Sequence, residues 1–247
     1  LLNSFGTKAQ LLDSRALIKT DDAFNNAKVD ESQSKENVMR NFKNLDPEVV
    51  PVVTGFIASN SKGATTTLGR NGTNYTAALL ANFLDARELV NYTHVDGIFT
   101  ADPNLVPEAK RIDSISYEEA NELANFGAHI LHAKTIVPLI EKNIPLRIRN
   151  TFNPKSPGTR IEVNPGNGGI KSLSVQEDAA LIYLEGSGLL GNVGIDARIS
   201  RVSGQNTINV GIISQGSSER GIVLIVNATK AKKAKQVLDL EFETDYR

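Results

Sequence analysis

The 247-residue chain contains no cysteine and no tryptophan, and it has one methionine and three histidines. The absence of cysteine excludes a disulfide scaffold and any metal site built from thiolates, and it fits a reducing cytoplasm. The histidines form no HExxH pattern, so we expect no zinc centre and no other protein-held metal. These absences leave a globular protein without a redox or metal scaffold.

The sequence also lacks an excess of either charge and a long apolar run. It has 27 basic and 28 acidic residues, and neither sign forms a tail, so nothing indicates a nucleic-acid partner. No run of about eighteen apolar residues and no signal-peptide pattern occurs. We therefore expect a cytoplasmic protein that has no membrane partner.

The most informative segment runs from Thr65 to Ala78, where Gly69 and Gly72 flank Arg70 and hydroxyl and amide side chains lead into a helix of small residues. The upstream apolar run 49–53 predicts a buried strand. A strand, a glycine-rich turn and a helix start present backbone N–H groups to an anion. The guanidinium of Arg70 adds a fork that suits carboxylate or phosphate. The segment predicts a site for a small anionic metabolite.

Strand-like and helix-like segments alternate through the first two thirds of the chain, which favours an α/β sandwich. Ser116 and Glu119 form a capping box at a helix start, and Pro138 is expected to kink or restart the helix 132–142. The pairs Asp96-Gly97 and Asp102-Pro103 predict turns.

A second unit follows the linker Asn164–Gly169, whose proline and glycines break regular structure. Its expected order is β-α-β-β-α, the ferredoxin-like pattern without its last strand. The expected elements are 179–184, 193–202, 207–214, 221–226 and 229–240. Gly186, Gly188 and Gly191 match G-x-G-x-x-G, but the next strand ends without the carboxylate that a dinucleotide fold requires.

Five blocks of sequence together resemble the aspartate kinases of the amino-acid-kinase family. They are residues 53–57, 66–75, 95–103, 126–132 and 150–154. The later unit resembles an ACT domain, including the segment 212–219. The resemblance implies the C-terminal part of a three-layer α/β kinase sandwich over residues 1–165 and a ferredoxin-like ACT domain over residues 166–247. A fused homoserine dehydrogenase in the full protein is also compatible with it.

The resemblance implies transfer of the ATP γ-phosphoryl group, with Mg²⁺, to the side-chain carboxylate of L-aspartate, which opens lysine, threonine and methionine biosynthesis. Arg70 matches the arginine that binds the substrate carboxylate, and Thr73 matches a serine that contacts aspartate. Asn74 stands in place of a catalytic aspartate. From the residues alone, Arg70 could be a solvated arginine and Thr73 could be a helix N-cap.

The nucleotide side of the resemblance departs from the family pattern. It maps to Thr93, His94, Phe99, Asn104 and His129. The last four replace the usual Asp, Tyr, Arg and Lys, and Lys134 stands where Arg is common. The changes at Asn104 and His129 remove fixed positive charge near the phosphates. The two histidines could equally be hydrogen-bonded structural residues.

The family's N-terminal Lys-Phe-Gly-Gly turn has no counterpart in this sequence, so we expect the chain alone to be inactive. The alternative function is a catalytically silent amino-acid sensor or dimerisation module. The ACT resemblance implies a threonine or lysine effector, feedback regulation, and a homodimer or higher oligomer formed through ACT domains. The effector candidates are Asn192, Gly194, Asn209, Val210 and Gln215. The alternative for these candidates is a purely structural role, in which Asn192 only caps a helix and Gln215 lies on a solvated strand end.

Overall fold

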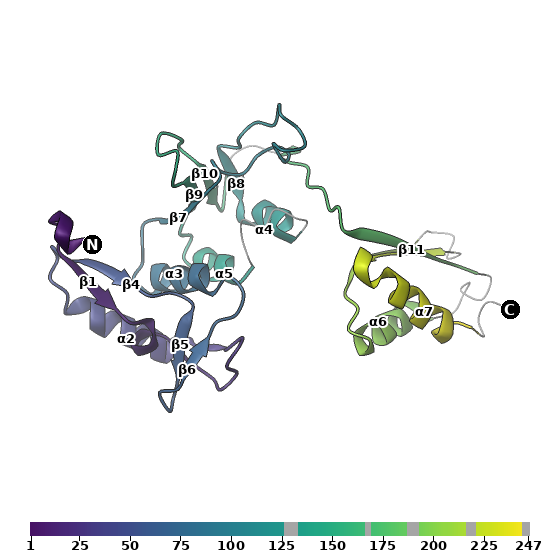
Figure 1. Cartoon of the computed structure of the whole chain (residues 1–247), viewed down its shortest axis with the longest axis horizontal. Helices are drawn as coiled ribbons and strands as arrows, with labels where there is room; N and C mark the ends of the chain where they lie inside the picture. The colour runs from purple at the N-terminus through teal and green to yellow at the C-terminus, as the bar shows by residue number, and fades with distance from the viewer. Residues whose placement is uncertain (126–132, 166–168, 187–192, 216–220, 244–247) are drawn as a thin grey trace. The chain divides into compact units, whose positions relative to one another are not determined.

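The structure is a computed structural model that describes residues 1–125, 133–165, 169–186, 193–215 and 221–243. The chain divides into two compact units, Leu1–Val175 (unit 1) and Gln176–Arg247 (unit 2). Each unit is a mixture of helices and strands (Figure 1). The predicted α/β class is confirmed.

Unit 1 contains five helices and one 3-10 helix among its described residues: η1 (Asn3–Phe5), α1 (Ser14–Leu17), α2 (Glu31–Lys43), α3 (Gly72–Phe83), α4 (Tyr117–Asn125) and α5 (Ala133–Glu141). Its described strands are β1 (Ala9–Leu12), β2 (Lys19–Thr20), β3 (Val29–Asp30), β4 (Val50–Val53), β5 (Ile57–Asn60), β6 (Thr65–Thr67), β7 (Leu89–Thr93), β8 (Ser114–Ser116), β9 (Leu146–Asn150) and β10 (Thr159–Glu162). They form a two-stranded sheet β1-β4 and two four-stranded sheets, β3-β2-β5-β6 and β7-β9-β10-β8.

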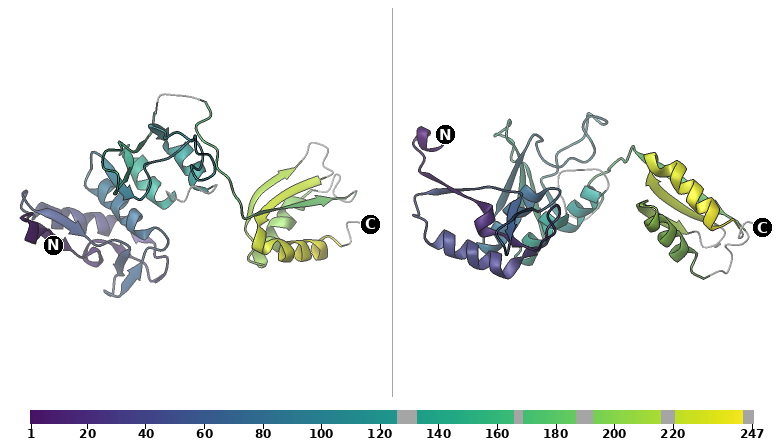
Figure 2. Two further views of the ribbon diagram at one scale, coloured as in Figure 1. Left: turned by 45° about the horizontal axis from the view of Figure 1, so that its top comes forward. Right: turned by 60° about the horizontal axis from the view of Figure 1, so that its bottom comes forward.

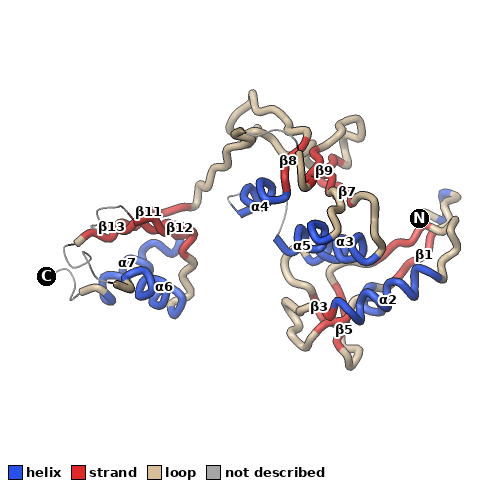
Figure 3. Tube along the Cα trace, turned by 180° about the vertical axis from the view of Figure 1, so that it is seen from behind, coloured by secondary structure: helices blue, strands red, loops and turns tan. Residues whose placement is uncertain are grey.

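Helix α3 lies between the two hydrophobic clusters of unit 1. Ala78 and Ala81 pack into the cluster under β7-β9-β10-β8, which contains Leu146. Leu79 and Phe83 pack into the other cluster with residues of α1, α2 and β5. Figure 3 shows α3 beside α5, and the two helices are in contact. Because both clusters bury α3, its N-terminus has a fixed position in unit 1.

The apolar run 49–53 does contain a strand, β4, but the prediction that this strand is buried is wrong. Strand β4 pairs only with β1 among the described strands, and Val50 and Val52 are 46% and 40% exposed. A two-stranded sheet offers little surface to cover an apolar face. The strand that leads into the glycine-rich turn is β6, whose middle residue Thr66 is buried.

The predicted capping box at α4 is confirmed. The backbone N–H of Ser116 donates to Glu119 Oε2 at 2.9 Å, and the N–H of Glu119 donates to Ser116 Oγ at 3.1 Å. Pro138 lies inside α5, which continues from Ala133 to Glu141, so the predicted restart does not occur. The proline carbonyl is held from outside by the side-chain amide of Asn82 at 2.7 Å.

Unit 2 has the predicted β-α-β-β-α order. Its described elements are β11 (Ala179–Glu185), α6 (Ile195–Gln205), β12 (Val210–Gln215), β13 (Gly221–Asn227), η3 (Ala228–Lys230) and α7 (Ala231–Glu241). The antiparallel sheet has the order β11-β13-β12, and both helices cover one face (Figure 2). The ferredoxin-like prediction is confirmed, and an antiparallel sheet excludes a dinucleotide-binding reading of the glycine motif. That motif lies mostly outside the described residues.

Candidate functional site

The turn between β6 and α3 uses two left-handed backbone positions. Gly69 has φ 79° and Asn71 has φ 57°, and the N–H of Gly72 closes the turn on the Gly69 carbonyl at 3.0 Å. Asn71 is the N-cap of α3, and its side chain makes no capping hydrogen bond. The first N–H groups of a helix have no intrahelical acceptor, so this N-terminus can bind an anion.

Glycines allow the backbone on both sides of the turn to approach closely. A Cβ on Gly72 would lie 2.8 Å from Cδ2 of Phe56, and a Cβ on Gly55 would lie 2.8 Å from Cγ2 of Thr73. Phe56 itself has φ 74°, which is unfavourable for a large side chain. The N–H of Phe56 donates to Thr76 Oγ1 at 3.2 Å, and its carbonyl accepts from Leu68 at 3.0 Å. These contacts hold the aromatic ring beside the helix start.

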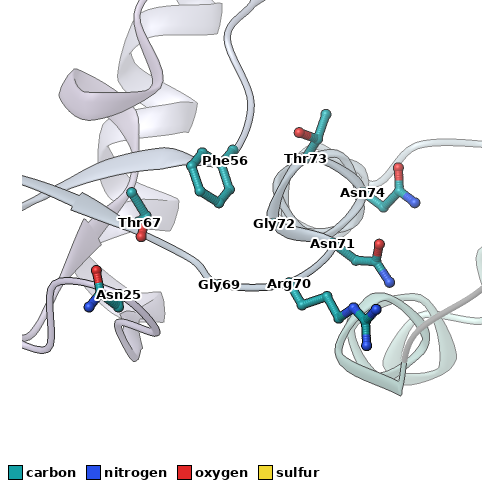
Figure 4. Close-up of a pocket in the computed structure, with 9 residues that line it drawn as sticks. All are labelled: Asn25, Phe56, Thr67, Gly69, Arg70, Asn71, Gly72, Thr73 and Asn74. Atoms are coloured by element: carbon teal, nitrogen blue, oxygen red, sulfur yellow. The ribbon is translucent and has the colours of Figure 1, made fainter.

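An open pocket of about 590 Å³ lies over this helix start (Figure 4). It is lined by Asn25, Phe56, Thr67, Gly69, Arg70, Asn71, Gly72, Thr73 and Asn74. Arg70 is exposed and is the only charged residue among the described residues of this lining. The structure thus brings the three substrate-side residues of the sequence analysis, Arg70, Thr73 and Asn74, into one pocket.

Thr73 is not the N-cap of α3, which corrects that alternative. The cap is Asn71, and Thr73 is the second residue of the helix, with an exposed side chain on the pocket. Four further residues of the pocket lining were not predicted as ligand contacts: Asn25, Phe56, Thr67 and Asn71. Phe56 and Thr67 lie in two of the five family blocks, and Asn71 lies in the turn itself, whereas nothing in the sequence pointed to Asn25.

Asn25 reaches the pocket because the loop 21–28 is pinned to β6. The N–H of Thr67 donates to the Phe24 carbonyl, and the N–H of Ala27 donates to the Thr67 carbonyl, both at 2.9 Å. The carboxylate of Asp21 accepts from the N–H groups of Ala23 at 3.1 Å and Lys28 at 3.0 Å. The loop therefore forms one wall of the pocket, and its position there depends on tertiary hydrogen bonds to β6.

The nucleotide-side candidates lie outside this pocket lining. Thr93 ends β7, and its Oγ1 lies 3.4 Å from Nδ1 of the exposed His94. Phe99 forms an isolated bridge with Arg111. The N–H of Asn104 donates to Asp102 Oδ1 at 2.8 Å, as in the predicted turn. His129 lies outside the described residues.

The carboxylate of Asp96, in the loop after β7, accepts hydrogen bonds from the last residue of β9 and from the loop that follows β9. Its Oδ1 accepts from Nδ2 of Asn150 at 2.8 Å and of Asn153 at 3.2 Å. Strands β7 and β9 are parallel, so both loops leave the same edge of the sheet. Gly97 has φ 137°, which agrees with the predicted turn. Ligands of parallel sheets bind at this carboxyl edge, which Thr93 and His94 occupy.

The effector candidates of unit 2 divide between two places. Asn209 and Val210 precede or begin β12, whereas Gln215 ends it and is exposed. Val210 and Gln215 lie five residue steps apart along the strand, which is about 17 Å. Gly194 is the N-cap of α6 with φ 91°. Asn192 lies outside the described residues.

Within the described ranges, no group of three or more histidine, cysteine, aspartate or glutamate side chains could hold a metal ion. No helix in those ranges is long and apolar enough to cross a membrane.

Comparisons with known proteins identify the class. Residues 1–150 match the amino acid kinase family, and residues 182–242 match an ACT domain. The chain belongs to the amino acid kinase family, and it carries an ACT domain behind the matched segment.

The chain is similar to several aspartokinases. It is 40% identical over 209 residues to the bifunctional aspartokinase/homoserine dehydrogenase of Haemophilus influenzae. The aligned segment covers 82% of this chain and 25% of that protein. It matches the crystal structure of E. coli aspartokinase III with lysine and aspartate (T-state) at TM-score 0.83 and 32% identity, over 98% of this chain and 55% of that one. The R-state structure with aspartate and ADP matches at TM-score 0.74 and 33% identity, over 92% and 50%. The chain therefore spans between a quarter and about half of these relatives.

Proposed function

We propose that the chain is part of an aspartate kinase, which transfers the γ-phosphoryl group of ATP to the side-chain carboxylate of L-aspartate. In this proposal residues 1–165 belong to the catalytic domain and residues 166–247 form the regulatory ACT domain. One observation carries the proposal: Arg70, Thr73 and Asn74 line one pocket at a helix N-terminus. Its support is the similarity to an aspartokinase that binds aspartate and ADP.

The pocket chemistry suits the aspartate side of the reaction. The fork of Arg70 would bind a carboxylate in two parallel hydrogen bonds, and the hydroxyl of Thr73 would add a third. The positive end of α3 would stabilise the same anion. Asn74, which replaces the family's aspartate, would orient the reacting carboxylate through its amide. Phosphoryl transfer depends on such positioning and charge neutralisation.

The nucleotide would bind at the carboxyl edge of β7 and β9, with Thr93, His94, Phe99, Asn104 and His129 as its contacts. The hydrogen bonds from Asn150 and Asn153 to Asp96 keep the loops of this edge together. The described residues offer no cluster of carboxylates for a resident ion. Mg²⁺ would bind the ATP phosphates, which are its usual ligands in kinases.

The test is the formation of aspartyl phosphate by the complete protein that contains this chain. With ATP, Mg²⁺ and L-aspartate, hydroxylamine should trap the acyl phosphate as aspartyl hydroxamate, because an acyl phosphate reacts readily with this nucleophile. Omitting ATP, or replacing L-aspartate with L-asparagine, which has no side-chain carboxylate to phosphorylate, should remove the product. Absence of hydroxamate from the complete reaction would contradict the kinase proposal and leave the alternative of a silent sensor or dimerisation module.

Unit 2 supports a regulatory role in the same proposal. A small amino acid cannot bridge the about 17 Å of strand between Val210 and Gln215, so an effector on one unit would contact one end of β12. The sheet exposes Leu181, Tyr183 and Ile213, which are 66%, 54% and 42% accessible. Such a surface suits assembly into a homodimer or higher oligomer.

Calorimetric titration of the chain with L-threonine, L-lysine and L-methionine tests the regulatory role. We expect threonine or lysine to bind, because the main-chain amides and polar side chains at either end of β12 can bind the charged ends of an amino acid. L-Alanine is the control, since it has the same charged ends without the distinguishing side chain. Binding by none of the three amino acids would contradict the sensor role without bearing on catalysis.

A further inference from the structure

The side chain of Asn26 lies between Lys134 and the turn that carries Arg70. Lys134 is the second residue of α5, it is partly exposed, and its Nζ donates a hydrogen bond to Oδ1 of Asn26. The same Oδ1 lies against the backbone of Gly69, because a Cβ built there would be 2.6 Å from it. A single amide group therefore separates the ammonium of Lys134 from the pocket turn.

The described residues of the pocket lining supply one cation for a ligand that has two carboxylates. Arg70 is the only charged residue among them, whereas L-aspartate carries two carboxylates beside its ammonium group, and its phosphorylation adds negative charge at the same place. A hydrogen bond from an ammonium to an anion is stronger than one to a neutral amide. The flexible four-carbon stem of lysine allows its ammonium to change partners.

We propose that Lys134 is the second cation of the anion pocket: its ammonium exchanges Asn26 for the negatively charged group of the ligand beside Arg70. In the free protein Asn26 holds the ammonium next to the turn, so little reorganisation is needed when the anion arrives. The proposal rests on the proposed aspartate site and adds a contact from α5, an element that contributes no residue to the pocket lining.

The experiment measures the Kd of the 247-residue chain for L-aspartate and for inorganic phosphate by calorimetry. We expect Lys134→Gln to raise both Kd values about tenfold, since it removes one charge-assisted hydrogen bond. Lys134→Met, which keeps an apolar stem for packing, should give the same result, and Lys134→Arg should stay near the unmodified chain. The matched control is Lys142→Gln, which removes a lysine next to the end of α5 that pairs with Asp85.

Asn26→Ala separates contact with the ligand from a purely structural effect. If Lys134 contacts the ligand, this variant should bind aspartate at least as tightly as the unmodified chain, because the ammonium loses a competing partner. If Lys134 only holds Asn26 against Gly69, Asn26→Ala should weaken binding as much as Lys134→Gln does. The second result would overturn the proposal.

The remaining outcomes are also decisive. If the unmodified chain binds aspartate or phosphate and Lys134→Gln does not weaken either, the inference about Lys134 is wrong and the pocket stands. If the unmodified chain binds neither anion, both the pocket assignment and the second cation are contradicted. Melting temperatures of all variants, measured by circular dichroism, identify any loss of affinity that comes from unfolding.

Discussion

Replacing Arg70 with alanine is expected to weaken the binding of L-aspartate by about 30- to 160-fold, which corresponds to about 2–3 kcal/mol. The guanidinium is the only charge that the described residues contribute to the pocket lining. Its removal would leave the ligand carboxylate with the hydroxyl of Thr73, the N-terminal end of α3 and the ammonium proposed for Lys134. Calorimetry on the chain gives the two dissociation constants directly.

Two further variants make this result specific. Arg70→Lys keeps the charge but loses the planar fork, so its affinity should fall between those of the unmodified chain and the alanine variant. Arg87→Ala removes an exposed arginine outside the pocket and should leave the Kd unchanged. Equal affinities for the unmodified chain and Arg70→Ala would show that the pocket is not the aspartate site.

Replacing Gly158 with alanine should destabilise unit 1 by about 3 kcal/mol or more. Gly158 has φ 76°, a conformation that alanine adopts at a cost, and a Cβ there would clash with the carbonyl oxygen of Ile148. Ile148 pairs with Thr159 in the β9–β10 ladder, so the clash falls on backbone that cannot move alone. Urea denaturation followed by circular dichroism measures the change in the free energy of unfolding.

Gly204→Ala is the matched control for this prediction. Gly204 lies in α6, and a Cβ there meets no atom within 4 Å. Alanine should stabilise the helix by about 0.5–1 kcal/mol, because it restricts the unfolded chain and fits the helical backbone. A Gly158→Ala variant as stable as the unmodified chain would contradict the packing described for the β9–β10 hairpin.

The sequence predicts those parts of the fold that local chemistry determines. The capping box forms because Ser116 and Glu119 have the spacing that two reciprocal hydrogen bonds require. Unit 2 follows the expected β-α-β-β-α order, and short apolar runs such as 221–226 form its strands. The boundaries differ by one to three residues, as for α6, which starts at Ile195 rather than Val193.

The sequence does not predict the features that depend on tertiary contacts. The apolar run 49–53 does not show that β4 would pair only with β1 among the described strands and leave Val50 exposed. Likewise, Asn25 and Asn26 belong to a polar loop without a motif, and long-range hydrogen bonds from the loop to β6 place them at the pocket. The pocket residues Arg70, Thr73 and Asn74 could be predicted because they lie within five residues of one turn and helix start, in a block that resembles the family pattern.

The most direct test of the anion pocket follows the backbone N–H groups themselves. In two-dimensional ¹H–¹⁵N spectra of the isotopically labelled chain, L-aspartate should shift the signals of Gly69, Gly72 and Thr73 most strongly, with saturation at a single Kd. The same addition to Arg70→Ala should leave those signals nearly unchanged at equal concentration. Saturable shifts confined to other residues, or no shifts at all, would contradict the assignment of this turn as the aspartate site.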